Sequence, residues 1–209
     1  MNTPAPTPHP ARRQFLLLLA IFLIPIATAY LLFFVFPKYV PKSTTNYGQL
    51  VRPARPLPAL KLIDADGRPI DAAKLFKGKW SAIFVGAANC AETCSQQLFL
   101  MRQVRIALDK DQTRYQRIYI APDTAALAAA HTLLASDHKD LLMVADAGDP
   151  GGRASDFFVP AAPDGWYLTD PLGNWLMVYP PHPDHDGQLK DFSGILKDLK
   201  HLLMLSQVD

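Results

Sequence analysis

Runs of apolar residues divide the chain into one long block near the start and many shorter segments after it. The apolar run Trp80–Val85 is typical of a strand buried on both faces of a sheet, and Tyr115–Ala121 and residues 141–144 repeat the pattern. Residues 60–63 and 69–70 flank an Asp-Gly turn, which predicts a β-hairpin. Trp166–Thr169 and residues 175–179 flank a second turn, Asp-Pro-Leu-Gly-Asn, which predicts another hairpin.

Between these strands the period changes to that of a helix. Five side chains recur at spacings of three or four residues and predict an amphipathic helix that ends near residue 110: Cys94, Leu98, Met101, Val104 and Leu108. Residues 74–78 predict a short helix, the Ala-rich stretch 124–136 a longer one, and the apolar positions between 192 and 203 a final one. The order of strands and helices predicts an α/β fold, with a mixed sheet covered by helices on both faces. We expect Trp80, Phe84, Leu98, Met101 and Trp166 to be buried around the central strand.

The first apolar block predicts a membrane anchor. Residues 15–36 contain no charge, and 22 helical residues are enough to span the hydrocarbon core. A cleaved signal peptide ending at Ala27-Thr28-Ala29 is the alternative, but cleavage there would leave the apolar residues 31–36 exposed. We therefore expect a cytoplasmic tail at 1–14, an anchor at 15–36, an extended Pro-rich linker at 37–58 and one domain at 59–209.

Charge gives the anchor a direction. Arg12 and Arg13 supply the whole net charge of +2, and they favour a cytoplasmic N-terminus. The two cysteines of the chain suit an oxidising compartment, so we expect a bacterial inner-membrane protein with its domain in the periplasm. From residue 37 onward the basic and acidic residues balance, and no basic patch predicts a nucleic-acid partner.

Cys90 and Cys94 are the main candidates for chemistry. They follow the strand Trp80–Val85 and a loop of small residues, with Asn89 as the expected helix cap. Four residues apart on a helix, the two thiols would share one face beside the backbone N–H groups that favour a thiolate. The spacing suits a reversible disulfide or a two-sulfur metal site, and the alternative is two buried structural cysteines. Glu92, the chain's single glutamate, either opposes thiolate formation or simply stabilises the first turn of the helix.

A dithiol at the end of the central strand is typical of a thioredoxin-like fold, and further residues resemble one family with this fold. Phe84-Val85-Gly86, the CxxxC pair Cys90 and Cys94, and the Trp166-Tyr167-Leu168 strand with its Asp-Pro-Leu-Gly-Asn turn resemble the Sco/SenC family. Tyr47-Gly48-Gln49-Leu50 resembles a divergent Sco-like group of oxidase-assembly proteins in proteobacteria. The resemblance covers residues 47–206. It implies a membrane-anchored thioredoxin fold that takes part in cytochrome c oxidase assembly and binds copper.

The copper ligands that the resemblance implies are incomplete in this chain. The family adds to its two cysteines a histidine just before the late strand, where this chain has Ala161-Ala162-Pro163-Asp164-Gly165. Asp164 would approach the dithiol if Pro163 took the place of the thioredoxin cis-proline. The remaining candidates are expected to be solvated surface residues: His131, His138, His182, His185 and His201. The alternative for His182 and His185 is a separate metal-binding loop with Asp184 and Asp186. Because thiolates satisfy Cu(I), Cys90 and Cys94 alone would hold Cu(I) while Cu(II) binding would be weak.

These observations favour an assembly factor or metallochaperone over an enzyme. We expect a periplasmic thioredoxin-like protein that acts on cytochrome c oxidase subunits or other assembly factors, by thiol–disulfide exchange, Cu(I) delivery or both. Two alternatives are a docking module with a structural disulfide and a general periplasmic thiol oxidoreductase. A peroxidase is disfavoured, because no proline lies between Trp80 and Cys94 to build the approach to its thiol.

Overall fold

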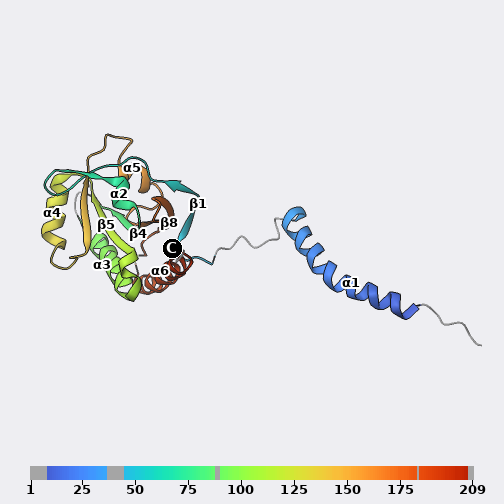
Figure 1. Ribbon diagram of the computed structural model, residues 1–209. Helices are drawn as coiled ribbons and strands as arrows, with labels where there is room; N and C mark the ends of the chain where they lie inside the picture. The colour runs from blue at the N-terminus through green and yellow to red at the C-terminus, as the bar shows by residue number, and fades with distance from the viewer. Residues whose placement is uncertain (1–8, 37–44, 88–89, 183, 207–209) are drawn as a thin grey trace, which may run out of the picture. The chain divides into compact units, whose positions relative to one another are not determined.

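The computed structural model describes residues 9–36, 45–87, 90–182 and 184–206, and the side chains of residues 9–11 and 185 lie outside this description. The chain divides into two units, residues 1–45 and 46–209 (Figure 1). The first unit contains helix α1, His9–Tyr30, which continues as a π-helical turn, Leu31–Val35. Its segment Arg12–Val35 has a mean hydropathy of 2.6 and is long and apolar enough to cross a membrane. A secretory signal sequence has the same two properties.

The second unit is built on a mixed sheet. In the described residues the sheet has eight strands in the order β1-β8-β7-β4-β5-β6-β2-β3. Their bounds are Gln49–Pro56 (β1), Lys61–Ile63 (β2), Pro69–Asp71 (β3), Trp80–Val85 (β4), Tyr115–Ala121 (β5), Leu141–Asp146 (β6), Trp166–Thr169 (β7) and Asn174–Tyr179 (β8). Strands β4, β5 and β6 are parallel, and β7 pairs antiparallel with β4. The predicted mixed sheet is confirmed.

Helices cover both faces of this sheet (Figure 1). Their bounds are Ala72–Phe76 (α2), Glu92–Ala107 (α3), Thr124–Leu134 (α4), Ala154–Phe158 (α5) and His185–Leu205 (α6), with a 3-10 helix at Asp109–Arg114. Side chains of α3, α4 and α6 pack in one apolar cluster with Phe84, and those of α2 and α5 pack in a second cluster with Ile83. Because neighbouring residues of a strand point to opposite faces, β4 contributes to both clusters and every one of its residues is buried.

The expected core is confirmed around β4. Trp80, Phe84, Leu98, Met101 and Trp166 are all 5% exposed or less. The helical spacing identified from the sequence corresponds to the buried face of α3, whose outer face stays open to solvent. Burial of this stripe holds the first turn of α3 at the end of β4, where the two cysteines lie.

The expected linker at 37–58 is wrong for its second half. Gln49–Pro56 forms edge strand β1, which pairs antiparallel with β8. Just before it, the backbone N–H groups of Tyr47 and Gly48 donate to the two carboxylate oxygens of Asp198 at 3.0 and 2.8 Å, and the Tyr47 hydroxyl donates to Asp191 at 2.6 Å. A linker has no such buried partners. These two carboxylates on α6 therefore fix where the globular unit begins.

Candidate functional site

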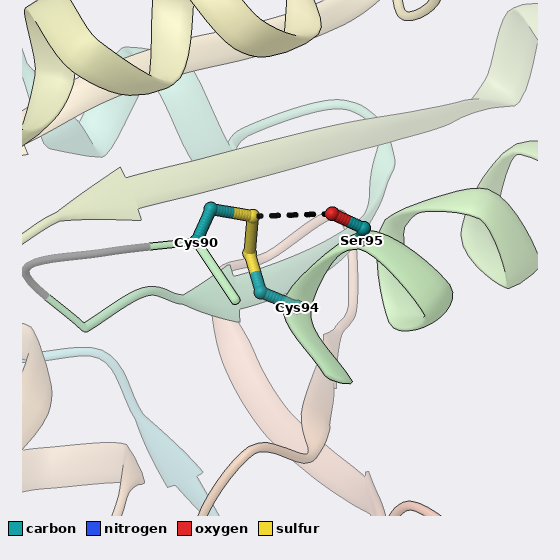
Figure 2. Close-up of a disulfide and its surroundings, with 3 residues drawn as sticks. All are labelled: Cys90, Cys94 and Ser95. Atoms are coloured by element: carbon teal, nitrogen blue, oxygen red, sulfur yellow. Dashed lines mark hydrogen bonds between the residues drawn. A yellow bond between two sulfur atoms is a disulfide. The ribbon is translucent and has the colours of Figure 1, made fainter. Parts of the chain in front are cut away.

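Cys90 and Cys94 form a disulfide at the end of the central strand. The two sulfurs are bonded, and the Cα atoms are 5.1 Å apart. Figure 2 shows Cys90 in the loop that follows β4 and Cys94 in the first turn of α3. The bond brings the two predicted site residues together, and their role as a redox or copper-binding pair stays a prediction.

The helix begins later than expected. Asn89, the expected cap, lies outside the described residues, and α3 starts at Glu92 after Ala91, which makes no side-chain capping bond. Cys90 therefore precedes the helix, and the expectation that both cysteines lie on one helical face is wrong. The bond joins a loop residue to the first turn. As the alternative for Glu92 proposed, its carboxylate is in that first turn, where it accepts a hydrogen bond from Gln96 at 3.1 Å.

The two sulfur-bearing residues differ in exposure. Cys94 is 7% exposed and packs in the apolar cluster of α3, whereas Cys90 is partly exposed. The Ser95 hydroxyl lies 4.0 Å from the Cys90 sulfur (Figure 2). An incoming thiolate therefore has its access at Cys90. The leaving sulfur would be Cys94, which sits among the N-terminal N–H groups of α3, where a thiolate is stabilised.

Close packing at Gly86 holds the loop after β4 against the next strand. The Gly86 N–H donates to the carbonyl of Ile120 at 2.9 Å. A Cβ atom at Gly86 would collide with the hydroxyl end of Tyr119, whose ring stacks on Phe84 at a centroid distance of 6.2 Å. Burial raises the pKa of Tyr119. Because residue 86 is glycine, the loop can leave the sheet in close contact with the Tyr119 ring, and the chain then reaches the start of α3 through Cys90.

A third copper ligand is not assembled beside the pair in the described part of the chain. No group of three or more His, Cys, Asp or Glu side chains there has a metal-binding arrangement. His182 Nδ1 instead contacts Asp191 at 2.7 Å, while His131 and His201 are exposed, as expected. The side chain of His185 lies outside the description. In their reduced state Cys90 and Cys94 offer two sulfurs, a donor set that fits Cu(I) and lacks the imidazole of the family site.

The segment before β7 does not serve the cysteines as expected. Ala162 packs in the cluster on the opposite face of the sheet from Cys94, so a side chain there points away from the disulfide. The peptide bond before Pro163 is not cis. Asp164 lies near Tyr167, whose pKa is raised by burial and then by this carboxylate. The expected approach of Asp164 to the dithiol is therefore unsupported.

His138 was expected at the surface, and this expectation is wrong. It is 6% exposed, and its Nδ1 lies 3.3 Å from Arg117, which is fully buried and pairs with Asp140 at 2.6 Å. Burial, followed by the charges of Arg117 and Arg102, lowers the pKa of His138. Only the folded chain reveals this group, because the three residues come from β5 and from the connection into β6.

A groove of about 700 Å³ lies along the outer face of α3. We call it the α3 groove. It is bordered by Ser95, Phe99 and Arg102 of α3, by Leu133 at the end of α4, and by Leu189 and Phe192 near the start of α6. Ser95 therefore both borders the groove and lies beside the Cys90 sulfur. The sequence did not predict this groove. Its one signal was Phe99, a large apolar residue that lies outside the stripe of α3 side chains buried against the sheet.

Comparison with known proteins supports the fold. The family described as "Transmembrane-like, thioredoxin-like, C-terminal domain" matches residues 80–206, which include both cysteines. No curated protein matches the chain in sequence.

Solved structures of Sco proteins share this fold at low identity. Apo Sco1 of Thermus thermophilus is 18% identical, with a TM-score of 0.53 over 78% of this chain and 99% of its own. Yeast Sco1, solved with copper bound, is 20% identical, with a TM-score of 0.51 over 76% of this chain and 95% of its own. BsSco, described as a Sco-family cytochrome c oxidase assembly protein with a disulfide switch, is 14% identical, with a TM-score of 0.52 over 79% of this chain and 100% of its own. The resemblance to Sco/SenC proteins is confirmed at the level of the fold.

Proposed function

Because the chain belongs to the family of transmembrane-like, thioredoxin-like C-terminal domains, we propose that it is a membrane-anchored assembly factor for cytochrome c oxidase that acts by thiol–disulfide exchange. One observation carries the proposal: Cys90 and Cys94 are bonded at the end of the central strand, and Cys90 is the more exposed residue of the two. The role in oxidase assembly rests on the Sco fold and on the function given for BsSco.

In the proposed reaction the thiolate of a partner cysteine attacks the sulfur of Cys90. The Cys90–Cys94 bond breaks, its electron pair leaves on Cys94, and a mixed disulfide joins the partner to Cys90. A second thiolate of the partner then attacks its own bridged sulfur, and Cys90 leaves as a thiolate. The partner's thiols become oxidised, and the Cys90–Cys94 pair becomes reduced. Exchange in the reverse direction reduces a partner disulfide.

In the reduced state Cys90 and Cys94 would also carry Cu(I) as cargo. Two thiolates form a soft donor set that suits Cu(I), and an open coordination position would let a partner's ligand enter during transfer. We expect the reduced protein to bind Cu(I), and Cys90→Ser or Cys94→Ser to abolish this binding. We expect no strong sulfur-to-Cu(II) charge-transfer band. Tight Cu(II) binding that depends on His182 would contradict this donor set.

A redox titration of the full chain in detergent tests the exchange mechanism. The fraction of oxidised Cys90–Cys94 is measured by alkylation and mass spectrometry in glutathione and dithiothreitol buffers of known potential. A working pair should titrate above about −300 mV, and a structural disulfide below it. A midpoint below that value would favour the alternative, a docking module whose disulfide only braces the loop. A working pair that reacts equally with unrelated periplasmic thiol proteins would favour a general oxidoreductase.

The membrane placement is part of the proposal. We propose that α1 is an uncleaved anchor with Arg12 and Arg13 on the cytoplasmic side and the thioredoxin-like unit in the periplasm of a bacterial cell. Alkaline phosphatase fused after Asp209 should then be active, and the protein should stay in membranes after carbonate washing. A shortened, soluble mature form would instead identify the helix as a signal sequence.

A further inference from the structure

The α3 groove is bordered by a residue that lies beside the redox pair. Ser95 borders it, and the Ser95 hydroxyl lies 4.0 Å from the Cys90 sulfur, which is the sulfur that an incoming thiolate can reach. A molecule bound at the Ser95 end of α3 therefore lies close to the Cys90 sulfur. A volume of about 700 Å³ falls within the range of sites that bind small molecules or a few residues of a peptide.

The walls of the groove are apolar and exposed. Phe99, Leu133 and Leu189 are 52%, 56% and 58% exposed, and they come from three different helices. Isolated exposed apolar residues are ordinary, but here they gather around one groove beside a reactive bond, as they do in interaction sites. Such walls would favour a partner segment with large aliphatic or aromatic side chains.

Arg102 adds a charge to this surface. Its guanidinium lies over the Phe99 ring at 5.3 Å, and its Nη1 donates to the carbonyl of Asp137 at 2.5 Å. Among the described residues the Arg102 Nε, which is shielded from solvent, has no hydrogen-bond partner, and Asp137 borders the same groove. A guanidinium beside apolar walls is complementary to a carboxylate on the occupant.

The spacing along α3 fixes how the occupant would be arranged. Ser95 and Arg102 are seven residues apart on a helix, a rise of about 10 Å. Three residues of extended chain span about the same distance. An extended segment with its cysteine at Cys90 would then place the third residue after that cysteine at Arg102, and the two residues between them against Phe99 and Leu189.

We propose that the α3 groove recognises the polypeptide partner of the Cys90–Cys94 pair, through an extended segment in which two apolar residues separate a cysteine from an acidic residue. This inference rests on the proposed exchange function and names the substrate class of the same site. Recognition of this kind would give the pair a preferred partner among the thiols around it.

Exchange kinetics of the oxidised full chain in detergent test the proposal. Four short peptide thiols are compared with glutathione: Cys-Leu-Leu-Glu, its reversed sequence, Cys-Ser-Ser-Glu and Cys-Leu-Leu-Gln. Each peptide's rate is first divided by its rate of reaction with a small aromatic disulfide, which corrects for the reactivity of its thiol. After this correction we expect the faster of Cys-Leu-Leu-Glu and its reversed sequence to reduce the Cys90–Cys94 disulfide about tenfold faster than Cys-Ser-Ser-Glu. The Gln peptide should be about three- to fivefold slower than its Glu counterpart, the effect of a partly exposed ion pair.

Variants separate the groove from the chemistry. Leu189→Ser should remove the protein's preference for the Leu peptide over the Ser peptide. Arg102→Gln should remove its preference for the Glu peptide over the Gln peptide, and Arg102→Lys should keep part of that preference. The glutathione rate of each variant is measured as the reference against which its peptide rates are compared. Equal rates for all peptides with the wild type, or preferences that survive in the variants, would overturn the groove proposal while glutathione still reduces the pair. A peptide rate that rises as the protein is diluted would identify a second copy of the chain as the occupant and also overturn it. If glutathione does not reduce the pair, the proposed function fails, and this inference fails with it.

Discussion

Replacing Asp198 by Asn should loosen the start of the globular unit from α6. Asp198 is 7% exposed, and its two oxygens accept three hydrogen bonds: from Tyr47 N at 3.0 Å, from Gly48 N at 2.8 Å and from the Tyr179 hydroxyl at 3.4 Å. An amide has one oxygen and one NH₂ group. Whichever way it turns, a donor faces a backbone N–H, so at least one charge-assisted bond is lost and one shielded N–H is left without a partner.

The expected loss follows from these contacts. A hydrogen bond to a charged group contributes about 1.5–3 kcal/mol, and a shielded donor without a partner costs about 1–3 kcal/mol. Because the two effects overlap, we expect Asp198→Asn to lower the free energy of unfolding by about 2–4 kcal/mol. For a domain whose total stability is about 5–15 kcal/mol, this is a large fraction.

Urea unfolding of the full chain in mild detergent measures the loss. The signal is the fluorescence of the three tryptophans, all of which are buried in the sheet unit. Asp186→Asn is the matched control, since Asp186 is exposed in the first turn of the same helix and should lose less than about 1 kcal/mol. Hydrogen exchange at residues 49–56 should rise only in Asp198→Asn. If both variants unfold at the same urea concentration, the carboxylate does not hold Tyr47 and Gly48 as argued.

Three further predictions concern the sheet and its edges. Phe84→Ala should lower the unfolding free energy by about 3–5 kcal/mol, because a buried ring at 1% exposure leaves a cavity between β4 and α3; a loss under about 1 kcal/mol in urea unfolding would refute its place in the core. Gly86→Ala should cost about 1–3 kcal/mol by overpacking against Tyr119, and adding Tyr119→Phe should reduce that cost in a double-mutant cycle. Because the pKa of His138 is lowered in the folded protein, the unfolded chain binds a proton at this histidine first as the pH falls. The free energy of unfolding should therefore decrease as the pH drops below about 6.5. His138→Gln should flatten this part of the stability–pH curve. An unchanged slope in the variant would show that another group is responsible.

Much of the sheet unit was predictable because its signals are local. Strand β4 is a run of residues buried on both faces, and α3 buries side chains three and four positions apart, so each pattern can be recognised in a few consecutive residues. The hairpin of β7 and β8 is similarly defined by its turn. The place of the two cysteines at the end of β4 followed from the same local order, and so did the expectation that they share one site.

The folded structure decided what depends on distant partners. The segment of strand β1 was predicted as a linker because proline recurs in it and in the Ser-, Thr- and Asn-containing residues around it. Only pairing with β8 and the carboxylates of α6 make it part of the sheet. His138 is buried because Arg117 arrives from β5, and Ala162 faces away from Cys94 because the segment before β7 packs on the opposite face.

The division between sequence and structure is sharpest at the redox pair. The sequence by itself determined that Cys90 and Cys94 follow a buried strand at a spacing that permits a bond, since composition and periodicity are properties of neighbouring residues. It did not determine that Cys90 precedes α3 or that Cys94 alone is buried. Nor did it reveal the α3 groove, whose walls come from three helices that are up to about a hundred residues apart in the chain. Tertiary packing decided these, because burial and access depend on which segments the fold brings against one another.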